Sequence, residues 1–438
     1  MVAVYGAAWY ARRFGRHYRR KLRELRDGEH FDSQQFADLQ RSSLRRVVNA
    51  AAASAYYRPL LSAAGLLGRD VELDDLPRLP TLSKQTLRER PRDLLTAAPG
   101  WSTKIMRSSG TTGTPTDIYY TAQFHQEGLA YFQARSRDWA GIGPGDERAM
   151  FGVRKVCNFE QSEPPFWRRS PVEHLTYYSI YHLSPKNLAS YVDQLTRQRP
   201  RLIMGYPSAI HVVARYINET GRRVPAGAII TTSETVTDDF RAEAEKAFEC
   251  KLFDQYGAVE GTHFVSQCAA GRYHVSPERG IIEILDGDRP CAPGELGRVV
   301  VTGLENTLQP LLRYEIGDVA QWAVDQNCPC GRRMPILGGI EGRYEDMCEL
   351  PDGRRMLRFD TVFKGVTSIT EAQVVQTSAD RFVINVVPTA DFGETDRDRL
   401  IDNFRRHAGG ADVEVVKLDQ IPRTAGGKFR AVINQTAT

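Results

Sequence analysis

Short apolar segments alternate with helical segments through the middle of the chain, and this alternation limits the possible folds more than any other feature. The segments with the character of strands are 149–153, 202–204, 227–231 and 251–254. The segments with helical character between them are 186–199, 207–220 and 237–249. Such alternation indicates an α/β fold, in which helices cover a largely parallel sheet.

The pattern changes twice toward the C-terminus. A β-rich patch bounded by glycine or proline turns includes residues 280–285 and 297–302. After Gly342 come a hairpin signal at 351–353, a strand-like stretch at 382–387 and a helix-like stretch at 396–407. A chain of 438 residues has room for two or three domains. We therefore expect a large N-terminal domain over residues 1–343 and a small α+β domain over residues 344–438.

Composition argues against several classes of protein. The net charge of +4 is small for this length, so a nucleic-acid partner is not expected. No apolar run approaches the ~20 residues that cross a bilayer, and the N-terminus lacks the residue order of a secretory signal. Seven scattered cysteines, an odd number, fit reduced thiols better than a disulfide framework. We expect a cytoplasmic enzyme or binding protein.

A basic segment near the N-terminus allows two interpretations. Its basic residues are Arg12, Arg13, Arg16, Arg19, Arg20, Lys21, Arg23 and Arg26. Phe14, Tyr18, Leu22 and Leu25 recur among them at helical spacing, which predicts an amphipathic helix. The helix could dock on an anionic membrane or an acidic partner, or its apolar stripe could pack on the main domain. We favour packing, because one short helix without a lipidation signal binds membranes weakly.

The sharpest motif is the sequence SSGTTGTPT at residues 108–116, directly after a strand-like stretch at 103–107. Its glycines permit tight turns, and successive amides and hydroxyls can surround phosphate oxygens. It is not a Walker loop, because the Gly-Lys-Ser/Thr ending is absent. By itself such a run is more often a flexible loop.

Four further motifs follow it in a fixed order. They are YGAVEG at 256–261, RYEIGD at 313–318, GRYED at 342–346 and PRTAGGK at 422–428. Each is weak alone, because turns, acids and lysines are common on protein surfaces. The ordered set of five is much more specific.

With these motifs the sequence resembles the adenylate-forming superfamily of acyl-CoA synthetases, peptide-synthetase adenylation domains and luciferases. Within it, the chain is most similar to the phenylacetate–coenzyme A ligase family and its CapK-type relatives. Further segments that carry this resemblance are 56–58, 75–77, 79–84, 205–208 and 232–235. The resemblance covers nearly the whole chain. It implies that the large domain binds ATP and a carboxylic acid, and that the small domain is a mobile lid turning about Glu345.

The resemblance also implies a role for each motif residue. The residues that would hold the β- and γ-phosphates are Ser108, Ser109, Gly110, Thr111, Thr112, Gly113 and Thr114. The residues that would form the adenine pocket are Ser233, Glu234, Tyr256 and Gly257, with Tyr256 stacking on the base. Glu260 would ligate Mg²⁺, and Asp318 would accept hydrogen bonds from the ribose. Arg343 would contact the ribose or phosphate, and Lys428 would stabilise charge at the α-phosphate on closure.

The implied reaction is ATP-dependent formation of an acyl-adenylate with release of pyrophosphate, followed by transfer to an acceptor. Apolar residues near the motifs, namely Phe166, Trp167, Tyr206, Ala258 and Val259, favour an aromatic or hydrophobic acid. CoA is the default acceptor. The sequence departs from many CoA ligases at Thr116, where they have lysine, and after Asp346, where a polar hairpin follows. The alternatives are an amide synthetase or a carrier-protein loading enzyme, and, from another class, a non-catalytic binding protein on the same fold.

A second constellation consists of Cys268, His274, Cys328 and Cys330. Three thiolates and one imidazole suit a closed tetrahedral zinc site. The Cys-x-Cys spacing is tighter than the usual knuckle, so buried cysteines beside an unrelated histidine remain an alternative from the residues alone. Some members of the resembled family carry similar cysteines bound to zinc, and the resemblance therefore implies a structural Zn²⁺.

Overall fold

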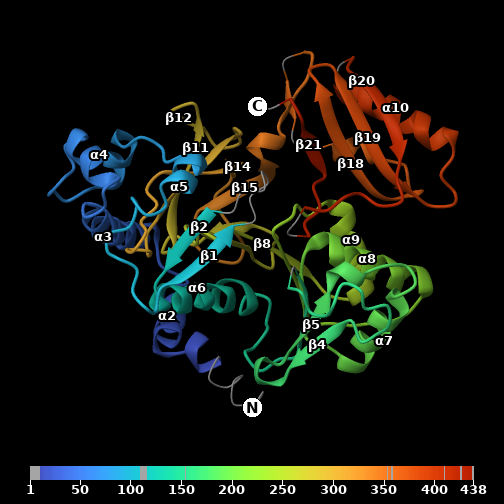
Figure 1. Cartoon of the computed structure of the whole chain (residues 1–438), viewed down its shortest axis with the longest axis horizontal. Coiled ribbons are helices and arrows are strands. Elements are labelled where there is room, and N and C mark those ends of the chain that lie inside the picture. The colour runs from blue at the N-terminus through green and yellow to red at the C-terminus, as the bar shows by residue number, and fades with distance from the viewer. Residues whose placement is uncertain are drawn as a thin grey trace. The chain divides into compact units, whose positions relative to one another are not determined.

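The structure is a computed structural model that describes residues 10–108, 116–152, 154–352, 354–356, 359–408, 410–424 and 427–436. The chain divides into two compact units (Figure 1). The large unit consists of Met1–Ile316 and Gln321–Gly339, and the small unit of Gly317–Ala320 and Ile340–Thr438. The fold is α/β, as the sequence predicted. The predicted boundary after residue 343 and the rotation about Glu345 stay predictions.

The described residues of the main sheet form thirteen strands in the order β12-β11-β13-β14-β15-β10-β9-β8-β7-β6-β3-β5-β4. A block of neighbouring strands runs parallel: β3 (Arg148–Gly152), β5 (Leu175–Ser179), β6 (Leu202–Gly205), β7 (Ala228–Thr232) and β8 (Leu252–Gly257). The helices between them are α7 (Leu188–Gln198), α8 (Pro207–Thr220) and α9 (Asp238–Phe248). The predicted alternation is therefore confirmed.

The rest of the sheet is largely antiparallel. Its strands are β4 (Trp167–Ser170), β9 (Phe264–Gln267), β10 (Tyr273–Val275), β11 (Gly280–Asp286), β12 (Arg289–Pro290), β13 (Gly297–Gly303), β14 (Tyr314–Trp322) and β15 (Ile336–Arg343). The predicted β-rich patch is the antiparallel pair β11–β13.

One core of the large unit lies where α7, α8 and α9 pack on the parallel strands. Phe151, Tyr191, Ile203, Val213 and Phe248 are fully buried there. Each contributes about 1.5–3 kcal/mol by leaving water. These helices present apolar residues three and four positions apart to the sheet, which is why the sequence revealed them.

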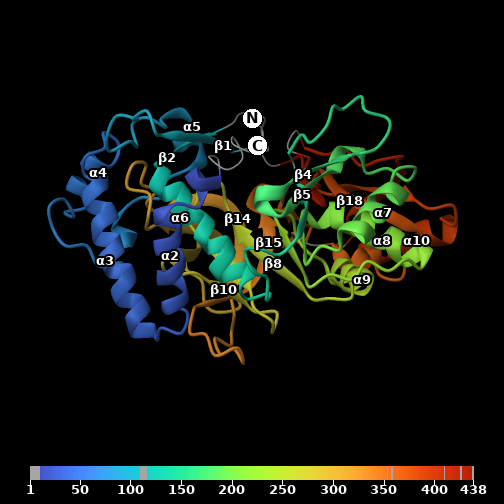
Figure 2. The same cartoon turned by 90° about the horizontal axis from the view of Figure 1, so that it is seen from below.

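The basic N-terminal segment packs on the large unit, as we favoured from the sequence. It forms α2 (Arg16–Asp27), which lies alongside α6 (Ala122–Phe132) in Figures 1 and 2. Tyr18 and Leu25 are buried in a cluster with Tyr131. Among the described residues, no helix is long and apolar enough to cross a membrane.

The remaining N-terminal elements are mostly helical. They are α3 (Ser33–Ala51), α4 (Tyr57–Ala63), η1 (Leu73–Arg78), α5 (Lys84–Glu89), the hairpin β1 (Lys104–Ser108) and β2 (Thr116–Tyr120), and the short helices η2 (Gln133–Arg137), η3 (Pro171–Glu173) and η4 (Ile180–His182). Asp32 caps α3 in a capping box with Gln35. The predicted phosphate loop joins β1 to β2, and its residues 109–115 lie outside the described residues, as does the side chain of Ser108.

The small unit has its own sheet, whose described strands follow the order β20-β19-β18-β21. These are β18 (Ile369–Ser378), β19 (Arg381–Pro388), β20 (Asp412–Lys417) and β21 (Val432–Asn434), and α10 (Glu394–Ala408) covers them. Phe382 and Phe404 meet in the core with ring centroids 5.0 Å apart. The turn predicted at 351–353 lies between β16 (Cys348–Glu349) and β17 (Arg355–Met356); η5 (Tyr344–Asp346) and η6 (Asp360–Phe363) flank this hairpin.

Candidate functional site

The predicted adenine-pocket residues lie together at one edge of the large sheet. Parallel neighbours β7 and β8 end there, with Thr232 paired to Gln255. Ser233 and Glu234 follow β7, while Tyr256 and Gly257 end β8. The carboxyl ends of parallel strands are where open α/β sheets bind ligands. The structure thus brings these four residues together, and their nucleotide contacts stay predictions.

Glu234 has a defined partner at this edge. Its Oε2 accepts a hydrogen bond of 2.9 Å from the backbone N–H of Ser208, in the first turn of α8. A carboxylate at a helix N-terminus is stabilised by the unpaired amides and by the helix dipole. This contact joins the two middle motifs, 205–208 and 232–235, into one structure.

Glu260 lies in the turn after β8 and is 5% exposed. Its Oε1 accepts a hydrogen bond of 3.0 Å from the hydroxyl of Tyr314, which is fully buried. Gly261 closes the turn at φ +65°, a conformation that favours glycine. A fixed carboxylate oxygen is the kind of ligand that Mg²⁺ prefers, so the residue fits its predicted role.

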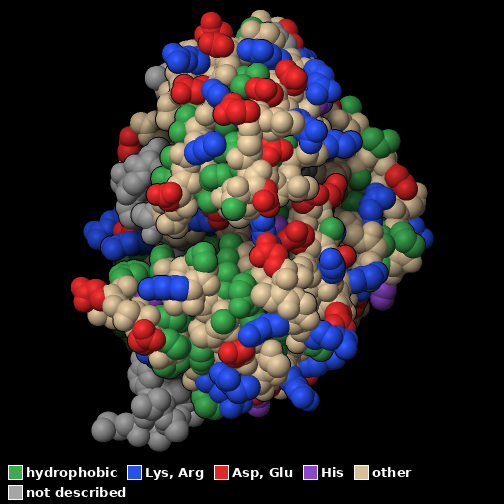
Figure 3. All heavy atoms as spheres, turned by 90° about the vertical axis from the view of Figure 1, so that its right-hand side faces the viewer, with side chains coloured by type: hydrophobic (Ala, Val, Ile, Leu, Met, Phe, Trp, Pro, Cys, Tyr) green, Lys and Arg blue, Asp and Glu red, His purple; other side chains and the backbone are tan. Residues whose placement is uncertain are grey.

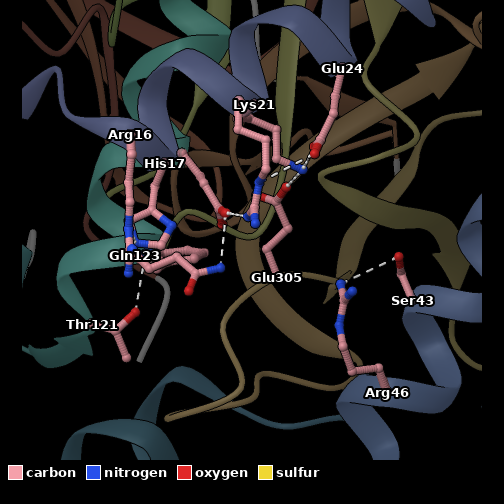
Figure 4. Close-up of polar contacts among 12 residues, drawn as sticks. Arg16, His17, Lys21, Glu24, Ser43, Arg46, Thr121, Gln123 and Glu305 are labelled. Atoms are coloured by element: carbon pink, nitrogen blue, oxygen red, sulfur yellow. Dashed lines mark hydrogen bonds and ion pairs between the residues drawn. The ribbon is translucent and has the colours of Figure 1, made fainter.

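A buried ion-pair cluster stands directly behind this turn. A Cβ atom on Gly261 would lie 2.7 Å from Nη2 of Arg279, so the guanidinium packs on the turn itself. Arg279 pairs with Glu305, and Glu305 also pairs with Lys21 of α2 at 2.9 Å. Figure 4 shows Lys21 and Glu305 pointing toward one another. Burial raises the pKa of Glu305, but Arg279 and Lys21 outweigh it and hold that pKa below its ordinary value.

A cavity of about 340 Å³ adjoins the same edge, and Thr232 and Gln255 belong to its wall. Gly205 and Tyr206 also line it. Gly205 has φ +149°, and a Cβ there would lie 1.9 Å from the carbonyl oxygen of Phe151, so β6 approaches β3 too closely for a side chain. A few hundred Å³ is the size of a small-molecule pocket.

Of the five residues that we expected to line an acyl pocket, the structure places Tyr206 at this cavity. Phe166 and Trp167 correct that expectation. Phe166 is fully buried in the core of the large unit, with its ring centroid 5.8 Å from that of Tyr191, and Trp167 packs against the same core. Ala258 and Val259 belong to the Glu260 turn and are not among the described residues that line the cavity.

Other predicted residues belong to the small unit. Arg343 and Asp318 form an ion pair, with Nε and Oδ1 3.1 Å apart, and Asp318 is 8% exposed. The backbone of Lys428 closes a turn with Thr424, whose side-chain oxygen accepts from the Lys428 N–H at 3.0 Å. The predicted action of Lys428 on the nucleotide stays a prediction. The side chain of Glu345 lies outside the described part of the structure.

The predicted zinc ligands do come together. Donor atoms of Cys268, His274, Cys328 and Cys330 all lie within 4.8 Å of one another. The sulfurs of Cys268 and Cys328 are 3.6 Å apart, and Cys330 Sγ is 3.4 Å from His274 Nε2. Zn–S bonds of ~2.3 Å in a tetrahedron separate two sulfurs by ~3.8 Å, so the donor set and its spacing fit zinc.

Comparison with known proteins now places the chain. Residues 352–435 match the family described as the CapK C-terminal domain. The sequence is 26% identical to Protein CapK of Staphylococcus aureus over 99% of this chain and 96% of that protein. It is 25% identical to the phenylacetate–coenzyme A ligase of Thermus thermophilus over 86% of this chain and 92% of that enzyme. The chain is a homologue of CapK and of phenylacetate–coenzyme A ligases.

The fold agrees with that relationship. A structure of 2-hydroxyisobutyryl-CoA ligase in the postadenylation state superimposes with a TM-score of 0.74 over 93% of this chain and 91% of that chain, at 22% identity. Anthranilate CoA ligase in complex with anthranoyl-AMP gives a TM-score of 0.53 at 14% identity. At such identities the likeness shows a shared fold. Together, the sequence matches and the shared fold confirm the resemblance that the sequence predicted.

Sequence reasoning missed the residues that surround the predicted ones. Tyr314, which holds Glu260, stands inside a recognised motif but was given no role. Arg279 and Glu305 belong to no motif, and their pairing needs the fold. The same holds for the arginines that line the cavity, such as Arg137 and Arg148.

Proposed function

We propose that the chain is an adenylate-forming ligase, which uses ATP to convert a carboxylic acid to an acyl-adenylate and then transfers the acyl group to CoA. One observation carries the proposal. Thr232 and Gln255 line a cavity of small-molecule size, and the residues that follow them, Ser233 and Tyr256, belong to the predicted adenine pocket. An acid in the cavity therefore has its carboxylate beside the nucleotide. Homology to phenylacetate–CoA ligases supports the same reaction.

The chain supplies residues for each task of the first half-reaction. Glu260 fits a Mg²⁺ ligand, which would offset phosphate charge. Asp318 accepts hydrogen bonds from the ribose hydroxyls, and Lys428 stabilises the charge that develops at the α-phosphate. A base is not needed, because the attacking carboxylate is already ionised at pH 7.

The acceptor defines a second candidate. A short hairpin, β16–β17, follows Asp346, the segment in which the sequence departs from many CoA ligases. This favours an amine or a carrier-protein thiol as the alternative acceptor. Adenylate formation is common to both candidates.

The test is ATP–pyrophosphate exchange with a panel of carboxylic acids, followed by addition of CoA, hydroxylamine or a carrier protein. We expect exchange with at least one acid. Lys428→Ala should lower the exchange rate about a hundredfold, the effect of losing one charge-stabilising group. Asp318→Ala should also raise the KM for ATP. ATP binding without exchange for any acid would favour the non-catalytic binding protein.

We also propose that the Cys268, His274, Cys328 and Cys330 cluster holds a structural Zn²⁺. Metal analysis of the purified protein should find one zinc per chain, and Cys328→Ser with Cys330→Ser should remove it and lower the melting temperature. Cys250→Ser is the matched control, since Cys250 lies outside the cluster. A metal-free wild-type protein of unchanged stability would refute the site.

A further inference from the structure

The cavity wall carries an excess of positive charge. Among the described residues that line it, the basic ones are Arg13, Arg137, Arg148 and Arg154, and the acidic one is Glu173. Apolar side chains such as Met150, Leu175 and Ile230 form much of the remaining wall. A pocket for a purely hydrophobic acid needs no such cations.

The carboxylate of Glu173 forms no ion pair with Arg137, Arg148 or Arg154 in the described structure. Its Oε2 accepts a hydrogen bond of 3.0 Å from Tyr177. Arg148 donates to the backbone oxygen of Glu173 rather than to its carboxylate, and the Nε of Arg148 is buried without a partner among the described residues. Arg154 stands 4.3 Å over the ring of Tyr177. Within the described part of the chain, Arg137, Arg148 and Arg154 form no ion pair.

A neighbour on the same short helix shows what the chain does with a structural arginine. The helix η2 (Gln133–Arg137) is a π-helix, a distortion that often marks functional sites. Its Arg135 is fully buried and pairs with Glu278. Two residues later, Arg137 lines the cavity, where such a partner is lacking among the described residues. Of these two arginines, the one that lines the cavity, Arg137, is therefore the one without an ion pair among the described residues.

Removing these cations from water is energetically unfavourable, and a bound anion would offset that cost. Burial, with a smaller contribution from the nearby Arg148 and Arg13, lowers the pKa of Arg137 to about 10. Burial also lowers the pKa of Arg148. Charged groups taken from water without a counter-ion are destabilising, and an Arg–carboxylate or Arg–phosphate contact restores the balance.

The register of β3 places this charge away from the nucleotide edge. Arg148, Met150 and Gly152 all line the cavity, as alternate residues of one strand face do. Arg148 begins the strand and Gly152 ends it, so about 13 Å of strand separates them. Gly152 ends at the edge that carries Thr232 and Ser233, because β3, β6 and β7 run parallel. The cavity is therefore apolar in its middle and carries Arg148 at the far end. The exposed Arg154 follows Gly152 in the chain and extends back over the ring of Tyr177, which pairs with Met150 in mid-strand.

We propose, on the basis of the proposed function, that the substrate is a carboxylic acid with an apolar body and a second anionic group, carboxylate or phosphate, at its other end. The second group binds Arg137, Arg148 and Arg154. The reacting carboxylate then lies at the strand ends, beside the predicted nucleotide residues. This adds a second anionic group to the aromatic or hydrophobic acid expected from the sequence.

The test compares matched acids in ATP–pyrophosphate exchange with the full chain. Each pair consists of a diacid and its monoamide, for example adipate and adipamate, or terephthalate and terephthalamate. A 4-phosphonobutyrate arm distinguishes phosphate-like from carboxylate ends. We expect kcat/KM for the better dianionic acids to exceed that of their monoamides by about tenfold or more, as charged hydrogen bonds contribute.

Arg137→Gln and Arg154→Gln should each lower this diacid-to-monoamide ratio about tenfold. Both residues are chosen over Arg148, whose burial in β3 makes a folding defect a risk. Arg197→Gln, an exposed arginine of α7, is the matched control and should leave the ratio unchanged. A melting-temperature shift with each diacid alone provides a readout that does not depend on catalysis.

The outcomes separate the two proposals. Exchange with monoamides at rates equal to the diacids, and a ratio unaffected in Arg137→Gln, would overturn the dianionic substrate while leaving the ligase proposal intact. Exchange with no acid, together with a diacid-induced stabilisation that Arg137→Gln abolishes, would support the anion site and overturn the ligase proposal.

Discussion

Arg279 and Arg148 are almost equally buried, at 6% and 7% exposure, yet their surroundings differ. Burial lowers the pKa of Arg279, but Glu305, together with Tyr131 and Tyr120, raises it by more, so the net shift is upward. Burial lowers the pKa of Arg148, and the nearby Glu173 does not reverse the shift. Arg279 has an ion pair that serves the fold, whereas Arg148 forms no ion pair within the described residues and is available to an outside anion.

The largest effect should come from breaking the paired cluster. Glu305→Gln leaves Arg279 buried without its carboxylate, and leaves Lys21 with Glu24 alone, so it should lower the free energy of unfolding by about 3–5 kcal/mol. Urea denaturation measures this change. Glu24→Gln on the half-exposed face of α2 is the control and should have little effect. A loss for Glu305→Gln as small as the control's would remove the distinction between the two clusters.

The same cluster predicts a dependence on pH. Because the pKa of Glu305 is held low, its stabilisation is present above the ordinary glutamate pKa of ~4.3 and is lost as pH falls through the folded value. The pKa of Lys21 is raised, since Glu305 outweighs burial, so its contribution persists until strongly alkaline pH. The difference in stability between wild type and Glu305→Gln should therefore be constant near neutrality and shrink in acid.

Removing one cation from the paired cluster should have a smaller effect. Lys21→Met leaves Glu305 paired with Arg279 and bonded to Tyr131 at 2.9 Å. The loss of one charged hydrogen bond should lower the free energy of unfolding by about 2 kcal/mol. A loss that matches that of Glu305→Gln would mean that Arg279 does not stabilise Glu305 in the absence of Lys21.

The cavity arginines should respond in the opposite direction. Arg137→Met removes a half-buried cation that has no ion pair among the described residues, and should raise the free energy of unfolding of the ligand-free protein by about 1 kcal/mol. Denaturation of both proteins without added anions measures the sign. A clear destabilisation would indicate that Arg137 serves the fold in the same way as Arg279.

The smallest effect is expected at the rim of the paired cluster. Arg20 contacts Glu127 at 2.6 Å, but its side chain is 51% exposed. Solvent screens such a pair, so Arg20→Gln should change the free energy of unfolding by no more than about 0.5–1 kcal/mol. Side chains of both signs are interspersed over the face seen in Figure 3, which illustrates how ordinary such exposed charges are on this protein.

Most elements between residues 148 and 257 could be predicted from the sequence because each signal is local, but β4 and β5 were not among those predicted. Strand and helix periodicities for β6, β7, α8 and α9 lie within single segments. The strand order could not be predicted in this way. β10 lies between β9 and β15, a partner some sixty residues further along the chain, and its three residues carry no signal of that pairing.

The candidate site shows the same contrast between residues with a local sequence signal and residues whose role depends on the fold. Motif residues such as Ser233, Glu234 and Tyr256 could be found because the family pattern is contiguous. Phe166 was misassigned because apolar character does not reveal whether a side chain faces a core or a cavity. Arg137 was missed because its significance lies in having no ion pair among the described residues, which a sequence does not record.

The anchoring of α2 has a consequence for protein synthesis. Lys21 leaves the ribosome long before Glu305, its ion-pair partner, is synthesised. Domains tend to form from the N-terminus as the chain emerges. The ion pair that anchors α2, however, can form only after Glu305 has been synthesised. Until then its basic side chains and the apolar stripe around Tyr18 and Leu25 have incomplete cover. A nascent chain interrupted before residue 305 would therefore expose α2, a surface that chaperones and proteases can recognise.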